Sequence, residues 1–345
     1  MLLLSVLLAA IFEMLGLPAG RLLGPMVAAI TLAVLGHEAN VPRRAFLAAQ
    51  GVIGLLIARG IPASMLATLS EHGAVLVAGV VTVTLLANAL GWMMAQWKVF
   101  PGDAAVWGSA PGAASAMMIM AEAHGADVRL VAFMQYLRVV CVSLSASLVA
   151  HWWIKSGGGA GAPSVAAASL FAAPAHWGGL AATLAVALGG TWLGVRLRLP
   201  AGALLLPLVA GVLLQDVGHV AIELPPLLLA VAYAFIGWTI GARFNRQVLA
   251  ASVRSLPKVL AATMLLIVLC GGLGALLVRW AHVDPLTAYL ATSPGGADSI
   301  AIIAASSPVD VPFVLTMQVL RMLFVMATGP AIARTLSRHI RRRGG

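Results

Sequence analysis

Long apolar runs recur along the whole chain and predict membrane-spanning helices. In the first half they cover residues near 1–16, 20–36, 46–69, 74–97 and 128–154. In the second half they cover residues near 177–195, 200–217, 225–242, 256–279 and 312–333. Most runs approach the roughly 17–25 residues that a helix needs to cross the hydrocarbon core of a bilayer. The pattern predicts an all-α polytopic membrane protein with about ten spanning helices.

Composition and charge support the same class of protein. The 345 residues are 61% hydrophobic and only 9% charged, whereas a soluble protein has about 25% charged residues. This excludes a soluble enzyme, a disordered protein and a disulfide-built secreted domain. The basic residues behind the net charge of +10 lie mostly between the apolar runs and near the C-terminus, where they orient membrane helices. The expected partner is therefore the lipid bilayer and no nucleic acid, with a homo-oligomer left open.

The two halves of the chain resemble each other at a fixed offset. Between 109–140 and 292–323, a shift of 183 residues, 12 of 32 positions are identical without a gap. The identities include Pro111 and Pro294, Gly112 and Gly295, Gln135 and Gln318, and Arg138 and Arg321. Self-similarity at one spacing indicates an internal duplication. We expect a first membrane repeat over 1–155, a Gly-rich linker with a short interfacial helix over 156–176, and a second repeat with a basic cytoplasmic tail over 177–345.

Each repeat contains a segment interrupted by Pro-Gly, at 103–125 and 286–308. Such a segment is either a broken crossing helix or a re-entrant hairpin, and charge favours the hairpin. With five crossings per half and the basic tail in the cytoplasm, the basic loop at 243–258 also lies inside, as the positive-inside rule requires. Six crossings would place that loop outside. An odd number of crossings makes the two repeats inverted.

Two arginines are the strongest candidates for function. Arg138 and Arg321 lie about ten residues into apolar helices, roughly 15 Å deep, where an arginine costs about 2.5–3.5 kcal/mol. Gln135 and Gln318 each precede an arginine by three residues and so share its helix face. The pairs predict either a polar solute-binding wall built twice or side chains that hold carbonyls freed by the Pro-Gly breaks.

The Pro-Gly segments are the second candidate. Broken helices near the membrane centre present half-helix ends that bind ions or solutes, although small residues there also serve tight helix packing. The candidate binding residues of these segments are Ser109, Pro111, Gly112, Ser115, Ser293, Pro294, Gly295 and Ser299. Asp298 is a carboxylate beside the second Pro-Gly break, and the equivalent position in the first repeat is Ser115. It is predicted either to couple transport to an ion or to pair with Arg321.

Metal and cofactor chemistry find no support in the sequence. The eight histidines are scattered, with no His-x₃-His or His-Glu-x-x-His spacing, whereas iron and copper sites need clustered ligands. We therefore predict no catalytic residue, no metal and no cofactor.

The duplicated Ser/Thr-x-Pro-Gly segment and the Gln-x-x-Arg helix resemble the AbrB-duplication membrane proteins over essentially the whole chain. The resemblance implies a multi-pass protein of the bacterial inner membrane. Members are described as regulators of gene expression or as ammonia monooxygenases. The family is also similar, at the level of fold, to inverted-repeat secondary transporters, which says little about substrate. We favour a secondary transporter of a small, anionic solute over a membrane regulator, and place a monooxygenase third.

Overall fold

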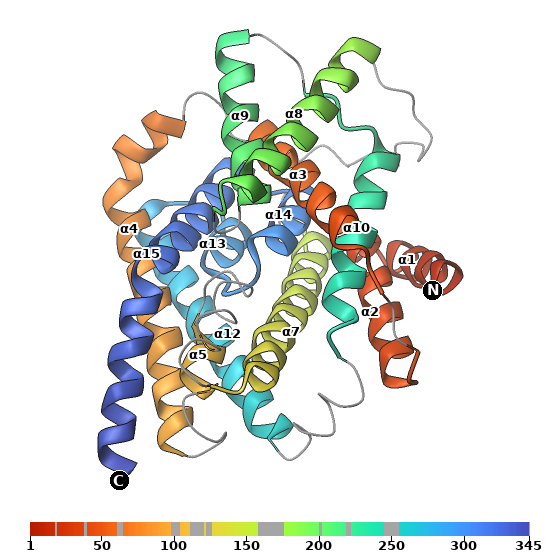
Figure 1. The fold of residues 1–345 in the computed structure, drawn as a ribbon. Coiled ribbons are helices and arrows are strands. Elements are labelled where there is room, and N and C mark those ends of the chain that lie inside the picture. Colours follow the sequence, from red (N-terminus) through yellow and green to blue (C-terminus); the bar gives the residue numbers. More distant parts are fainter. Residues whose placement is uncertain are drawn as a thin grey trace.

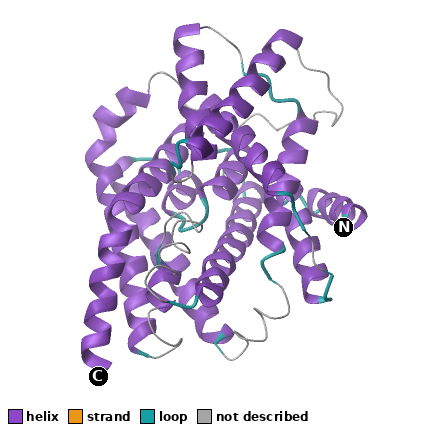
Figure 2. Cartoon of the chain, in the orientation of Figure 1, coloured by secondary structure: helices purple, strands orange, loops and turns teal. Residues whose placement is uncertain are grey.

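The computed structural model describes residues 1–17, 19–37, 40–60, 65–97, 104–110, 121, 126–157, 176–199, 202–218, 222–244 and 255–344. Every regular element in these ranges is a helix (Figures 1 and 2). The all-α prediction is therefore confirmed.

Five helices are long and apolar enough to cross a membrane. They are α4 (Met65–Gln96), α7 (Val128–Lys155), α8 (Trp177–Arg196), α12 (Leu256–Ala281) and α15 (Val311–Gly344). Four shorter apolar helices accompany them: α1 (Leu2–Met14), α2 (Gly20–Val34), α9 (Gly202–Gly218) and α10 (Pro226–Gly241). This pattern is that of a polytopic membrane protein.

Two predicted runs differ from the observed helices. The run at 46–69 is divided between α3 (Arg43–Gly60) and the first residues of α4, because Gly60 and Pro62 disfavour a continuous helix. The run at 312–333 continues to Gly344 within α15. The basic tail extends this helix because arginine is a good helix former.

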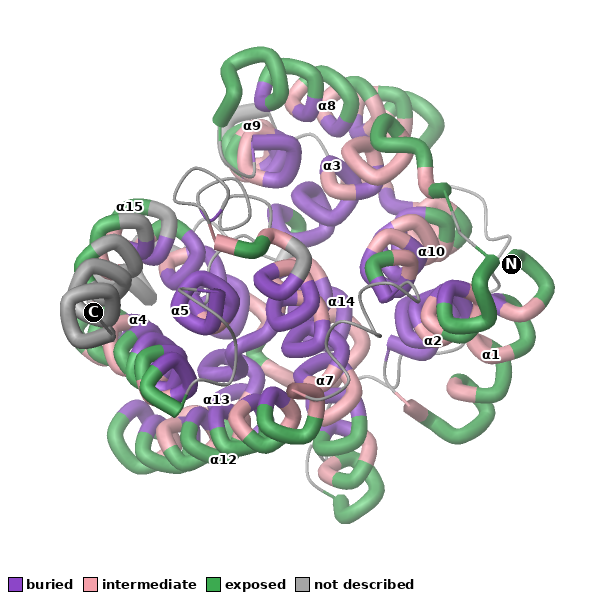
Figure 3. Tube along the Cα trace, turned by 60° about the horizontal axis from the view of Figure 1, so that its bottom comes forward, coloured by how far each residue is buried: buried purple, intermediate pink, exposed green. Residues whose placement is uncertain are grey.

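The helices form two groups (Figure 3). The first bundle consists of α1, α2, α3, α8, α9 and α10, in which α2 packs on α10 and α9 packs on α3. The hairpin bundle consists of α4, α7, α12 and α15 around the short helices α5 (Ala104–Ser109), α13 (Pro285–Thr292) and α14 (Ala297–Ala305). Helices α14 and α15 contact α3 and so join the two bundles.

The packing within the first bundle repeats between the two halves. A Cβ added at Gly237 of α10 would lie 2.7 Å from the carbonyl oxygen of Leu22 and 3.3 Å from the Cβ of Pro25. A Cβ added at Gly54 of α3 would meet Leu204 and Pro207 in the same way. Gly54 and Gly237 are 183 positions apart in the sequence, and the leucines and prolines that they approach are 182 positions apart. The duplication thus extends from sequence to helix contacts.

Candidate functional site

The segment from α13 to α14 folds back on itself. The backbone N–H of Asp310, at the start of α15, donates to Thr287 Oγ1 near the start of α13 at 3.0 Å. If α13 and α14 formed one straight helix, Ala305 would lie about 27 Å from Thr287. The five residues from Ala305 to Asp310 reach about 17 Å at most, so the chain must return. In the second half, the sequence-based preference for a hairpin over a crossing helix is confirmed.

Local sequence explains where this hairpin begins and turns. The Asp284 side chain caps α13 by accepting from the backbone N–H groups of Leu286 and Thr287 at 2.9 and 3.0 Å. After Ser293, the C-cap residue that ends α13, come Pro294 and two glycines, and α14 begins at Ala297. Asp310 in turn accepts from the N–H of Phe313 at 3.0 Å and caps α15.

Arg321 and Gln318 of α15 donate hydrogen bonds to the backbone carbonyls at the break between α13 and α14. Arg321 Nη1 donates to the carbonyl of Ser293, and Nη2 donates to that of Gly295 at 2.7 Å. Gln318 Nε2 donates to Leu290 O at 2.8 Å and to Ser293 O at 3.1 Å. The two side chains thereby satisfy carbonyls that a broken helix leaves without a partner, which inside a membrane would each cost several kcal/mol.

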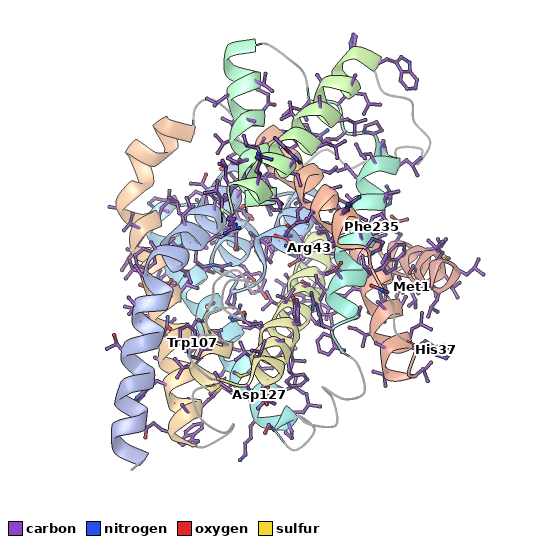
Figure 4. The ribbon with its side chains drawn as sticks, viewed as in Figure 1. Met1, His37, Arg43, Trp107, Asp127 and Phe235 are labelled. Carbon is purple, nitrogen blue, oxygen red and sulfur yellow. The ribbon has the colours of Figure 1, made fainter. Side chains whose placement is uncertain are left out.

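Matching bonds form around α5 in the first half. Gln135 Nε2 donates to Trp107 O at 3.0 Å and to Ala110 O at 2.9 Å. Arg138 Nη1 donates to the carbonyls of Ser109 and Ala110 at 3.0 and 3.3 Å. Trp107 lies on α5, on the lower side of the view in Figure 4. Three candidates, Pro111, Gly112 and Ser115, lie outside the described residues.

Two glycines that the sequence analysis missed allow this arrangement. A Cβ at Gly91 of α4 would collide with Ser109 and approach Ala105 O, and a Cβ at Gly274 of α12 would lie 3.1 Å from Thr292 Oγ1 and 3.3 Å from Ala288 O. The two glycines are 183 positions apart in the sequence, and so are the residues that they approach: Ser109 and Thr292, and Ala105 and Ala288. Extending the repeat comparison towards the N-terminus would have found both glycines.

The two arginine-centred breaks lie close to each other. Arg138 and Arg321 are near enough for their positive charges to interact, and the Cys270 thiol of α12 is near both. A Cβ at Gly295 would lie 2.9 Å from Val142 Cγ1, so the second break packs on α7 one turn beyond Arg138. Both arginines are buried, with 5% and 4% of their surface exposed. Two positive charges therefore share the centre of the hairpin bundle.

Negative charge does not balance them within the ranges that the structure describes. The ion pairs there are Glu13 with Arg21 and His176 with Glu223, both away from the arginine pair. Asp298 lies in the first turn of α14, where the helix dipole favours a carboxylate. Its side-chain partner is Gln50 of α3 in the first bundle, and no described basic group lies within 4.0 Å of it. The predicted pairing of Asp298 with Arg321 is not formed.

Two of the three remaining hydroxyl candidates bond to carbonyls three residues earlier in the chain. Ser109 donates to Val106 O at 3.1 Å, and Ser299 donates to Gly296 O at 3.2 Å. The Ser293 hydroxyl is buried and has no hydrogen-bond partner among the described atoms. Within the described residues, no group of three or more His, Cys, Asp or Glu side chains lies close enough together to bind a metal ion.

The apolar helices and the buried arginines that hold helix breaks define an all-α polytopic membrane protein with polar groups at depth. A family model described as "Transition state regulatory protein AbrB" matches residues 21–337, and the chain belongs to this AbrB family. It is 43% identical to "Putative regulator AbrB" of Escherichia coli strain K12 over 99% of this chain and 96% of that protein.

A second relative is more distant. The chain is 25% identical to "Uncharacterized protein YhjN" of Bacillus subtilis strain 168, over 94% of this chain and 89% of that protein. No solved structure matches the chain.

Proposed function

We propose that this protein is a secondary transporter of a small anionic solute in the bacterial inner membrane. The observation that carries the proposal is the pair of buried, neighbouring arginines without a described carboxylate partner. Unpaired buried charge is costly, and charged residues at membrane depth mark solute pathways. A bound anion would offset the repulsion between Arg138 and Arg321.

The helix breaks support the same proposal. Transporters with inverted repeats bind solutes where discontinuous helices meet near the bilayer midplane. Here the break between α13 and α14 packs on α7 beside Arg138. We assign the two repeats, 1–155 and 177–345, to opposite orientations in the membrane, so that the two breaks face each other across the solute.

Asp298 is the group to which we assign coupling. It lies on the hairpin and faces Gln50 of the other bundle, so movement between the bundles would change its surroundings. A carboxylate that alternates between a buried and a wet environment can carry a proton.

The proposal is tested by uptake of small organic anions, from acetate to citrate and glutamate, into proteoliposomes. Arg138→Ala and Arg321→Ala should each lower uptake about 10- to 100-fold, the loss expected for one hydrogen-bonded charge. Arg279→Ala is the matched control, because Arg279 is exposed at the end of α12, and it should transport normally.

The arginines also hold carbonyls, so folding is checked by size-exclusion chromatography. Asp298→Asn is the second variant: it conserves size and should retain solute exchange while losing the response to a pH gradient. Unchanged uptake in well-folded arginine variants would refute the assigned site.

A regulatory role is the second candidate, since the name of the Escherichia coli relative describes a regulator. A regulator that does not transport would give no uptake of any tested anion in the wild-type protein, while deletion of its gene would alter expression of other genes.

A further inference from the structure

Four polar side chains lie where the two bundles join. Gln50 of α3 and Arg243, two residues beyond the end of α10, come from the first bundle. Tyr136 of α7 and Asp298 of α14 come from the hairpin bundle. Helix α14 contacts both α3 and α7 (Figure 3). Polar and ionisable groups are rare at membrane depth, where they mark functional sites.

Ring contacts hold the end of α10 against α7. Cζ of Arg243 lies 5.4 Å from the centre of the Tyr136 ring, a distance at which a guanidinium and an aromatic ring attract each other. The neighbouring rings of Phe133 and Phe244 meet edge to face, with their centres 6.2 Å apart. Arg243 therefore has a fixed place beside Tyr136.

Asp298 lies on the other side of this tyrosine. Its side-chain partner is Gln50, and its charge is near enough to act on the Tyr136 hydroxyl. A Cβ at Gly296, in the residue before α14, would lie 3.8 Å from Val139 Cγ2, about one turn along α7 from Tyr136. The start of α14 thus packs on the same part of α7.

The four side chains differ from the buried arginines of the helix breaks in their accessibility. Arg243 is exposed, and Gln50, Tyr136 and Asp298 are half-buried. Arg243 also begins the basic loop at 243–258, which the positive-inside rule assigns to the cytoplasm. The cluster therefore runs from an exposed cation on the expected cytoplasmic side to a carboxylate between the bundles.

The groups that face Asp298 suit the exchange of a proton. Gln50 faces it from α3 and Tyr136 faces it from α7, whereas Arg321 of α15 bonds the carbonyls at the helix break instead. A carboxylate in an ion pair holds its charged form, but the partners of Asp298 are neutral. A tyrosine hydroxyl both donates and accepts hydrogen bonds, and a glutamine amide does so through separate atoms.

We propose that Asp298 takes up its coupling proton from the cytoplasmic side, along a water-accessible path lined by Arg243 and Tyr136, with Gln50 holding the carboxylate at the inner end. The proton comes from bulk water and binds a carboxylate oxygen, which makes Asp298 neutral. The inference rests on the proposed coupling role of Asp298. It adds the side from which the proton arrives and three residues that support its transfer.

Cysteine labelling of the full-length protein tests the path with no assumption about the solute. Gln50→Cys, in a background that carries Cys141→Ser and Cys270→Ala, should react with a membrane-impermeant methanethiosulfonate reagent at the cytoplasmic face of inside-out vesicles. Ile53→Cys is the matched control, because Ile53 is fully buried about one turn further along α3. It should react at least about tenfold more slowly, since a thiol buried among apolar groups is inert.

Transport measurements test the part played by Tyr136. Tyr136→Phe keeps the ring and removes the hydroxyl. It should retain anion uptake without a pH gradient and lose at least about tenfold of the acceleration that a gradient gives, because proton transfer depends on positioned protic groups. Tyr233→Phe is the control, since Tyr233 is buried in α10 near Arg21 and Arg59, and it should respond to the gradient as the wild type does.

Two results would overturn the inference: no reaction of Gln50→Cys from the cytoplasmic side, or a wild-type gradient response in Tyr136→Phe. Anion uptake by a protein whose Gln50→Cys variant is not labelled would refute the path and leave transport in place. Cytoplasmic labelling of Gln50→Cys in a protein that takes up no anion would support the path and refute transport.

Discussion

Replacing Gly237 with valine is expected to separate α2 from α10 and to prevent stable folding. The new Cβ would lie 2.7 Å from Leu22 O and 2.9 Å from Met26 N, both backbone atoms of α2. A backbone contact cannot be relieved by a change of rotamer, so the helices must move apart. Overpacking of this kind costs about 1–3 kcal/mol and more when the backbone must shift. The measurement is the thermal midpoint of unfolding in detergent, followed by size-exclusion chromatography.

Gly272→Val is the matched control for this substitution. Gly272 is also in the interior of a helix, α12, and a Cβ there would meet no atom within 4 Å. Valine has slightly better helix propensity than glycine, so this variant should unfold at or above the wild-type midpoint. Equal destabilisation by both variants would show that the close approach of α2 and α10 is not what Gly237 provides.

Gln318→Leu is the second substitution with a large expected effect. Leucine keeps the approximate volume but removes the amide that donates to the carbonyls of Leu290 and Ser293. Each buried carbonyl left without a donor costs about 1–3 kcal/mol. Of the two carbonyls of Leu290 and Ser293, Arg321 bonds only that of Ser293. We expect a loss of about 2–5 kcal/mol in the free energy of unfolding, together with loss of uptake.

Gln96→Leu controls for the change of residue type, because Gln96 is exposed at the end of α4 and should tolerate leucine. Gln135→Leu removes the equivalent donor in the first half and should destabilise to a similar extent. A wild-type midpoint for Gln318→Leu would mean that the carbonyls of the break do not depend on this side chain.

Much of the fold can be predicted from the sequence, because membrane helices are recognised by the length and hydropathy of their apolar runs. The runs at 128–154 and 256–279 correspond closely to α7 and α12. The run at 74–97 corresponds to the apolar span Gly73–Gln96 within α4. Gly60 and Pro62 indicate that a helix ends inside the run at 46–69, because both residues disfavour a continuous helix, and α3 ends at Gly60.

The candidate site was only partly predictable. The spacing of Gln318 and Arg321 placed both on one helix face, and the Pro-Gly break supplied carbonyls that needed donors. Sequence reasoning left open which role the arginines fill, and the structure shows the carbonyl-holding role directly. The contact of Asp298 with Gln50 depends on how two bundles pack. No local pattern encodes such a long-range contact.

The most direct test of transport is the accessibility of Ser293 from both sides of the membrane. Ser293→Cys conserves size at the hairpin tip, and the background carries Cys141→Ser and Cys270→Ala so that the new thiol is the sole target. In a transporter that alternates between two states, a membrane-impermeant methanethiosulfonate reagent should label this position from the cytoplasmic side and, separately, from the outer side. Labelling from neither side, or from one side only under every gradient and solute, would contradict the account.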